Sequence, residues 1–284
     1  MIYIGTCGFA YRDWIGSFYP PKTKPDEMLG YYARRFTAVE IDATYYGVLD
    51  RRSVQRMDAR TPDGFRFSFK APKSLTHAPG AAEAPSDELT RFIESLAPVA
   101  ASGKLASVLL QFPPAFLPTP RNHDYLKRVA AWLRGVPLVA EFREAAWQTG
   151  ETLALLRALH VGWCNLDMPS LESLLAPSTD ATSPVGYVRF HGRNAERWLT
   201  GDRITRYAYA YSREELEPWR ERLLAIAAHT QATYAFFNNH ARGGAARDAA
   251  TLESLLEARC PGEDNVLARA PGGNPEQRAL PGFS

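Results

Sequence analysis

Charged and amide side chains stand at the ends of short apolar runs in this sequence. They include Glu40, Lys70, Gln111, Glu141, Arg143, Asp167, Arg189, His191, Asn238, Asn239 and His240. A buried charge without a partner is costly, so such residues must pair with one another or bind a ligand. We interpret them as one functional site. The alternative is a structural ion network that closes one end of the fold.

Glu141 is the leading candidate for acid–base chemistry. It follows the apolar run Pro137-Leu-Val-Ala, so it is expected near the end of a buried strand. Burial raises the pKa of a carboxyl group and a nearby cation lowers it, and this opposition can leave a group poised for proton transfer. The rival interpretation is a permanently ionised carboxylate that orients Arg143 or Lys70.

Lys70, Asp167 and His191 complete the predicted catalytic set. Among carboxylates, Lys70 could be a point-charge anion binder or a tuned base. His191 lies between Arg189 and Arg193, and this grouping indicates an anion pocket. The residues predicted to bind the ligand are Glu40, Thr44, Tyr45, His77, Gln111, Arg143, Arg189, Arg193, Asn238, Asn239 and His240.

Aromatic residues follow the second and third predicted strands. The segments are Thr44-Tyr45-Tyr46 and Thr76-His77. Rings in such loops can stack on a sugar or a base. They can equally pack the loops onto the fold, and the sequence leaves both interpretations open.

A divalent metal is an alternative by ligand type. The donors would be Glu141, Asp167, His191 and His240. The nearby cations Lys70, Arg143 and Arg189 would repel it, so we assign no metal ligand. We also identify no cofactor, since the sequence has no glycine-rich phosphate loop and no other familiar catalytic motif.

These residues are positioned by short apolar runs that alternate with helical segments. The predicted strands are 2–6, 38–42, 65–71, 105–112, 137–143, 161–166, 185–191 and 233–238. The predicted helices are 25–36, 51–60, 86–101, 123–133, 151–159, 213–228 and 245–258, with a loop at 169–183. Eight strands with helices between them predict a single TIM-type (β/α)8 barrel. Active sites of such barrels lie at the carboxyl ends of the strands, where the polar residues would meet.

The chain of 284 residues is long enough for one such barrel, which we place at residues 1–260. Residues 261–284 are rich in Pro and Gly and are expected to be a poorly ordered tail. Three widely spaced cysteines predict no disulfide framework and a reducing compartment. We find no leader and no apolar run long enough for a membrane, so we expect a cytoplasmic protein without a membrane partner. The oligomeric state is not predicted.

Several motifs together resemble the YecE-like family, known as domain of unknown function 72. They include Ile4-Gly5-Thr6-Cys7-Gly8-Phe9, Val39-Glu40-Ile41-Asp42-Ala43-Thr44-Tyr45-Tyr46, Phe67-Ser68-Phe69-Lys70-Ala71-Pro72, Leu110-Gln111-Phe112-Pro113-Pro114, Glu141-Phe142-Arg143, Arg189-Phe190-His191-Gly192-Arg193 and Phe237-Asn238-Asn239-His240. The resemblance spans residues 2 to 258 and implies a TIM barrel, but it supplies no reaction. The family often has Ser at position 7 and Asn at position 42, where this chain has Cys7 and Asp42.

Two classes of function fit the sequence. The first is an enzyme that acts on a phosphate- or carboxylate-bearing, sugar- or nucleotide-like ligand at the strand ends, through phosphoester hydrolysis or other acid–base chemistry. The second is a non-catalytic protein that binds a metabolite or a nucleic acid. The net charge of +2 neither requires nor excludes a nucleic acid partner.

Overall fold

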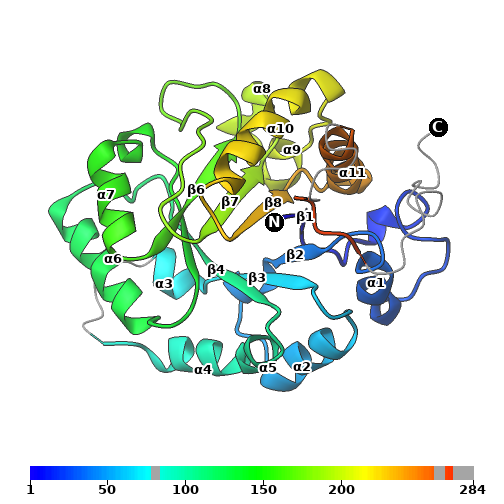
Figure 1. The fold of residues 1–284 in the computed structure, drawn as a ribbon, viewed down its shortest axis with the longest axis horizontal. Coiled ribbons are helices and arrows are strands. Elements are labelled where there is room, and N and C mark those ends of the chain that lie inside the picture. Colours follow the sequence, from blue (N-terminus) through cyan, green and yellow to red (C-terminus); the bar gives the residue numbers. More distant parts are fainter. Residues whose placement is uncertain (78–83, 259–265, 271–284) are drawn as a thin grey trace.

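Eight parallel strands form a closed barrel in sequence order, with β8 hydrogen-bonded to β1 (Figure 1). The computed structural model describes residues 1–77, 84–258 and 266–270. The strands are β1 (Ile2–Cys7), β2 (Ala38–Ile41), β3 (Arg66–Lys70), β4 (Leu105–Gln111), β5 (Leu138–Glu141), β6 (Val161–Asp167), β7 (Val185–Phe190) and β8 (Ala232–Phe237). The predicted TIM-type barrel is confirmed.

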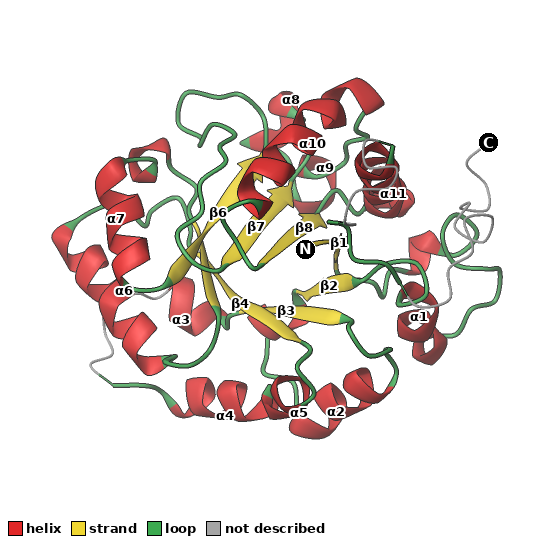
Figure 2. Ribbon diagram, in the orientation of Figure 1, coloured by secondary structure: helices red, strands yellow, loops and turns green. Residues whose placement is uncertain are grey.

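Helices surround the strands on the outside of the barrel (Figure 2). They are α1 (Pro25–Tyr32), α2 (Arg51–Ala59), α3 (Lys73–His77), α4 (Asp87–Ser95), α5 (Ala97–Ala101), α6 (Pro120–Trp132), α7 (Gly150–Ala158), α8 (Ala195–Trp198), α9 (Arg203–Arg206), α10 (Arg213–Ala227) and α11 (Gly244–Glu257). Short 3-10 turns lie at η1 (Arg12–Trp14), η2 (Ala43–Tyr45), η3 (Ala145–Trp147) and η4 (Ala241–Gly243). The helix expected at 86–101 is two helices, since the first ends before Pro98 begins a new turn.

The barrel interior is more polar than strands of this kind usually allow. Ser68 on β3 lies 3.0 Å from the Ser107 hydroxyl and 2.7 Å from the Tyr187 hydroxyl. Tyr187 in turn donates to Glu40 Oε2 at 2.7 Å. Successive side chains of a strand face opposite sides, so alternate residues of β2, β3, β4 and β7 meet inside. Each of these four polar side chains has a partner, which removes most of the cost of its burial.

Part of the segment assigned to the tail lies against the barrel. Leu267 forms a parallel bridge with Ile2, and the Ile2 amide donates to the Val266 carbonyl at 2.6 Å. Leu267 and Ala270 are buried. For residues 266–270 the expectation of a loose tail is therefore corrected, because backbone hydrogen bonds attach them to β1. The rest of the tail, 261–265 and 271–284, lies outside the described residues.

Within the described part of the chain, no helix is both long enough and apolar enough to cross a membrane.

Candidate active site

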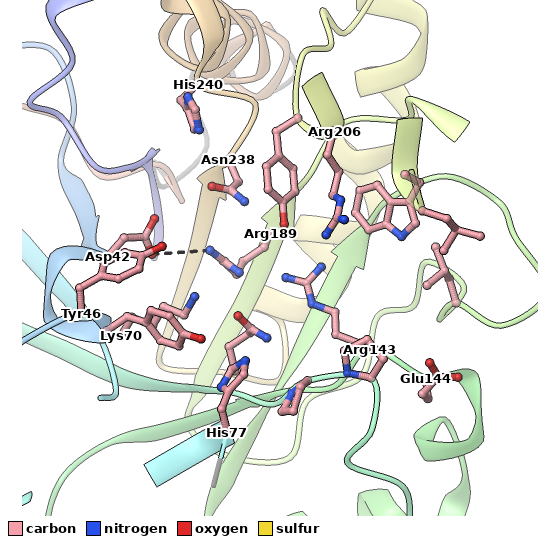
Figure 3. Close-up of a pocket in the computed structure, with 18 of the residues that line it drawn as sticks. Asp42, Tyr46, Lys70, His77, Arg143, Glu144, Arg189, Arg206, Asn238 and His240 are labelled. Atoms are coloured by element: carbon pink, nitrogen blue, oxygen red, sulfur yellow. Dashed lines mark ion pairs between the residues drawn. The ribbon is translucent and has the colours of Figure 1, made fainter. Parts of the chain in front are cut away.

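A pocket of about 530 Å³ opens at the carboxyl ends of the strands (Figure 3). Its size suits a small molecule. Cationic side chains on its wall are Lys70, Arg143, Arg189 and Arg206, and the carboxylates there are Asp42 and Glu144. Figure 3 shows Asp42 and Lys70 on one side, Arg143 and Arg206 on the other, and Arg189 between them. The lining is therefore richer in positive than in negative charge.

Arg189 connects two buried carboxylates in the floor of the pocket. Its Nη2 lies 2.7 Å from Glu40 Oε1, and its Nη1 lies 2.6 Å from Glu141 Oε2. Both carboxylates are 0% exposed and Arg189 is 2% exposed. Arg143 adds a second cation, with Nη2 2.5 Å from Glu141 Oε1. These ion pairs come from β2, β5 and β7, so the closed sheet brings them together.

The pKa values of Glu141 and Glu40 are shifted in opposite directions. Burial disfavours ionisation of Glu141, but Arg143 and Arg189 overcome it and hold its pKa well below the ordinary value. Burial raises the pKa of Glu40 to about 7, assisted by the charge of Asp42 and opposed by Arg189. Glu141 is therefore the ionised partner of two arginines, and Glu40 is the carboxyl group that titrates near neutral pH.

His191 is a neutral imidazole in the same cluster. Burial lowers its pKa to about 3, and the charge of Arg143 acts in the same direction. The Asn238 amide lies 3.1 Å from His191 Nδ1, and an amide NH2 can only donate there. The proton of the ring is then on Nε2, which lies 3.5 Å from Glu141 Oε1. His191 is thus a neutral neighbour of Glu141 and adds no charge to the cluster.

Lys70 ends β3 and lines the pocket wall. Its Nζ lies 4.2 Å from the centre of the Tyr45 ring. Burial lowers its pKa, Asp42 opposes that shift, and Arg189 adds to it. His77 lies beside the same Tyr45 ring at 5.1 Å, and burial with the charge of Lys70 lowers its pKa to about 4.

Aromatic rings form much of the remaining wall. Tyr11 stacks on His240 with centroids 4.9 Å apart and an angle of 11°. Trp198 and Tyr207 lie on the connection between β7 and α10, and both line the pocket. Their rings approach each other edge to face at 5.9 Å. Flat faces beside cationic groups are suited to a ligand that has both a ring and an anionic group.

The model of the family described as "Protein of unknown function DUF72" matches residues 3–272. The chain belongs to the DUF72 family. The UPF0759 protein YunF of Bacillus subtilis (strain 168) is 34% identical over 277 residues, which cover 90% of this chain and 95% of YunF. The UPF0759 protein YecE of Escherichia coli (strain K12) is 32% identical over 118 residues, 42% of this chain and 40% of YecE.

Solved structures of DUF72 proteins have the same fold. A crystal structure of a DUF72 family protein from Thermotoga maritima MSB8 matches with a TM-score of 0.82 and 34% sequence identity. The match covers 90% of this chain and 99% of the Thermotoga chain. A DUF72 family protein from Enterococcus faecalis V583 matches with a TM-score of 0.81 and 27% sequence identity. The match covers 90% of this chain and 96% of the Enterococcus chain. The resemblance seen in the sequence motifs is thus confirmed for the family and the fold.

The structure brings most of the predicted site residues of this DUF72 protein together. Those that line the pocket are Tyr45, Lys70, His77, Gln111, Arg143, Arg189, Asn238 and His240. Three more are buried in the ionic cluster with Arg189 and Arg143, namely Glu40, Glu141 and His191.

Asp167 and Arg193 are predicted site residues that do not join this cluster. Asp167 accepts from Arg193 Nη2, the Tyr211 hydroxyl and Trp219 Nε1, each at 2.6 Å. Tyr211 and Trp219 belong to α10 and the loop before it, on the outer face of the sheet. The side chain of Asp167 follows Leu166 and therefore points away from the barrel axis. The structure places Asp167, which the sequence predicted as catalytic, in a buried link between β6 and α10 rather than in the pocket.

Thr44 and Asn239 also make structural contacts rather than line the pocket. The Thr44 hydroxyl donates to the Lys70 carbonyl at 2.6 Å and so ties the loop after β2 to the end of β3. Asn239 Nδ2 donates to Asp248 Oδ2 at 2.7 Å and to the Tyr209 carbonyl at 2.9 Å. Both were predicted as ligand-binding residues, and both instead position the strand ends.

The predicted set omitted other residues that line the pocket. Asp42 lies two residues after Glu40, so the alternation of side chains along a strand could have placed it on the same face. Arg206, Trp198 and Tyr207 lie on the β7–α10 connection. Connections of this type usually have about 2–6 residues, so a much longer one with exposed-looking aromatics could have marked the site.

The four donors considered as an alternative metal site are not gathered, because Asp167 lies on the outer face and His240 stacks on Tyr11. Among the described residues, a different set has its donor atoms within 4.8 Å of one another: Cys7, Glu40 and Asp42. Arg189 Nη2 already lies 2.7 Å from Glu40, 3.4 Å from Cys7 Sγ and 3.9 Å from Asp42. Burial also raises the pKa of the Cys7 thiol. These donors do not fit a metal ion, since a guanidinium occupies the cation position.

Proposed function

We propose that this DUF72 protein is an enzyme that binds a small phosphate- or carboxylate-bearing molecule in the rim pocket and acts on it by acid–base chemistry. The observation that carries the proposal is the imbalance of charge around the pocket. Lys70, Arg143, Arg189 and Arg206 line it, against Asp42 and Glu144. In a confined pocket of low dielectric, an anionic ligand restores the balance.

The arginines differ in how free they are to bind an anion. Arg189 already holds Glu40 and Glu141, so its role is to raise the positive potential at the floor. Arg143 makes one ion pair through Nη2 and lines the pocket. Arg206 donates to the Gly201 carbonyl at 3.3 Å and has no carboxylate partner among the described residues. Arg143 and Arg206 are therefore the expected anion ligands, because a guanidinium matches a carboxylate or phosphate with paired donors.

The rest of the ligand is expected to carry a flat ring or a sugar. Tyr45 and Tyr46 stand on one side of the pocket, and Trp198 and Tyr207 stand on another. Aromatic faces stack on sugars and bases alike. The substrate class is therefore sugar- or nucleotide-like, and phosphoester hydrolysis is the first reaction to test.

Proton transfer in this site has two candidate groups. Burial raises the pKa of Glu40 to about 7. Arg189 Nη2 holds Glu40 and also lies 3.9 Å from Asp42, which lines the pocket. Lys70 has a lowered pKa because it is buried. A group with a pKa close to the working pH is the most effective acid or base.

The test is binding of inorganic phosphate and sulfate, measured by calorimetry and by crystals soaked in each anion. Phosphate or sulfate between Arg143 and Arg206 supports the proposal, and an empty pocket at saturating anion contradicts it. Turnover of nucleoside monophosphates and sugar phosphates then separates an enzyme from a binding protein. Salt-dependent binding of oligonucleotides without turnover would favour the non-catalytic alternative.

A further inference from the structure

Lys104 and Lys70 have contrasting environments. The sequence contains six lysines: Lys22, Lys24, Lys70, Lys73, Lys104 and Lys127. Lys104 is 5% exposed, and its Nζ lies 3.1 Å from Asp58 Oδ1, 2.8 Å from the Asp58 carbonyl and 2.9 Å from the Thr61 carbonyl. Every proton of that ammonium has an acceptor. Lys104 is therefore a structural lysine whose donors are all paired within the fold.

Lys70 is partly buried at the carboxyl end of β3 and lacks partners of the kind that Lys104 has. Within the part of the chain that the structure describes, its Nζ makes no ion pair and no hydrogen bond, and it packs on the Tyr45 ring at 4.2 Å. The neighbouring strand ends carry Arg189 and Arg143, which add positive charge. Asp42 is the carboxylate whose charge acts most on Lys70. Burial is the larger effect and lowers the pKa of Lys70, so its neutral amine is favoured more than in an ordinary lysine.

We propose that Lys70 is a nucleophilic amine that forms an imine with the carbonyl group of the anionic ligand. The proposal rests on the anion-binding function above and narrows its substrate class to 2-oxo acids and to aldehydes or ketones that carry a phosphate. A desolvated lysine beside other cations is the usual environment of an imine-forming amine. A lysine that merely binds an anion needs no such environment, since a hydrated ammonium does the same.

The reaction balances with groups that line the pocket. The lone pair of Lys70 Nζ attacks the carbonyl carbon, and the electron pair of the C=O bond moves to oxygen, which takes a proton. The nitrogen of this carbinolamine loses a proton, its lone pair forms the C=N bond, and the hydroxyl leaves with a proton as water. The product is the protonated imine, so the net change consumes one amine, one carbonyl and one proton and releases one water. Asp42 lines the same wall and can carry the proton from nitrogen to oxygen.

The pocket also holds the ligand in a suitable direction. Arg143 and Arg206 lie opposite Lys70, so an anionic group bound there points the rest of the molecule toward the amine (Figure 3). The Tyr45 ring covers one side of Nζ. The cations that attract the ligand also disfavour protonation of Lys70, because like charges repel.

The test is reductive trapping on the full-length protein. The protein is incubated with pyruvate or with dihydroxyacetone phosphate and reduced with borohydride. Intact mass and peptide mapping then locate any adduct. We expect one adduct per chain, on Lys70, with both or either probe, and none with lactate or glycerol 3-phosphate, which lack the carbonyl. The rate of trapping should rise with pH and level off below 10.5, the ordinary pKa of lysine. Adducts spread over the exposed lysines, with Lys70 unmodified, would overturn the proposal.

Two variants separate this proposal from simple anion binding. Lys70→Arg keeps the positive charge and removes the amine, so it should lose the adduct while it still binds inorganic phosphate. Lys73→Arg changes an exposed lysine three residues away and should trap as the wild type does. Peptide mapping of the wild type needs neither variant, so poor folding of Lys70→Arg would leave that result standing. Phosphate binding without any adduct sinks the imine and preserves the proposed function, whereas the absence of phosphate, pyruvate and dihydroxyacetone phosphate binding sinks both.

Discussion

Glu141 and Arg189 form a buried ion pair, with Oε2 and Nη1 2.6 Å apart. The other oxygen of Glu141 lies 2.5 Å from Arg143 Nη2. One carboxylate therefore pairs with two arginines that reach the pocket from different strands. The sequence offered two interpretations of Glu141, and its lowered pKa supports the ionised partner over the proton-transfer group.

We predict that Glu141→Gln destabilises the fold. The variant leaves Arg143 and Arg189 short of a buried counter-charge, and breaking such a pair costs about 3–5 kcal/mol. Urea unfolding of the two proteins measures the difference. Glu144→Gln is the matched control, since Glu144 lines the pocket without an ion pair among the described residues, and surface changes of this kind stay within about 0.5 kcal/mol. Equal stability of Glu141→Gln and the wild type would contradict the assignment.

The fold could be predicted because each strand is a short apolar run with a polar end. Glu40 and Glu141 were found by the same signal, since a charge at the end of a short apolar run is conspicuous. Asp167 shows the limit of that signal. Asp167 also ends a strand, β6, but its side chain points outward to Trp219 on α10. A shift of one residue along a strand moves a side chain to the opposite face of the sheet, and the sequence does not fix the strand end that closely. Arg206 shows the other limit, because it reaches the pocket from a loop whose path no local pattern specifies.

Glu40 should make stability depend on pH in a defined direction. Its folded pKa of about 7 exceeds its ordinary value of 4.5, so the folded protein binds the extra proton between these values. Its contribution to the free energy of unfolding is then largest below pH 4.5 and falls as the pH rises toward 7. The total change is on the order of 3 kcal/mol.

The measurement is the difference in unfolding free energy between the wild type and Glu40→Gln, taken at several pH values from 5 to 8. Subtraction cancels the groups that titrate alike in both proteins. We expect the difference to fall from pH 5 to 7 and then to level off. A difference that stays constant, or that rises over this range, would show that Glu40 is already ionised at pH 5.

Asp167→Asn should damage the fold and leave the pocket intact. The carboxylate accepts from Arg193, Tyr211 and Trp219, so the amide loses a buried charge pair and turns one donor toward other donors. Loss of such a partner costs about 3–5 kcal/mol. Binding of phosphate, measured by calorimetry well below the melting temperature, should match the wild type. A stable variant with weakened phosphate binding would return Asp167 to the functional site.

The last prediction concerns the two arginines that face Lys70. Arg206 has no carboxylate partner among the described residues, whereas Arg143 pairs with buried Glu141. Arg206→Gln should therefore weaken phosphate binding by about tenfold, equivalent to 1.4 kcal/mol, without a change in melting temperature. Arg143→Gln should weaken binding and also lower the melting temperature, because Glu141 loses a counter-ion.

Calorimetry and thermal melting of both variants give the comparison. Arg197→Gln on the same connection is a suitable control, since Arg197 is exposed and does not line the pocket. If Arg206 binds the anion, Arg206→Gln lowers the affinity for phosphate and leaves the melting temperature unchanged. A general structural defect would lower both. Unchanged phosphate affinity in Arg206→Gln would instead mean that the anion binds nearer Lys70. Lys70 would then bind the anionic end of the ligand, and the arginine side of the pocket would face the rest of the molecule.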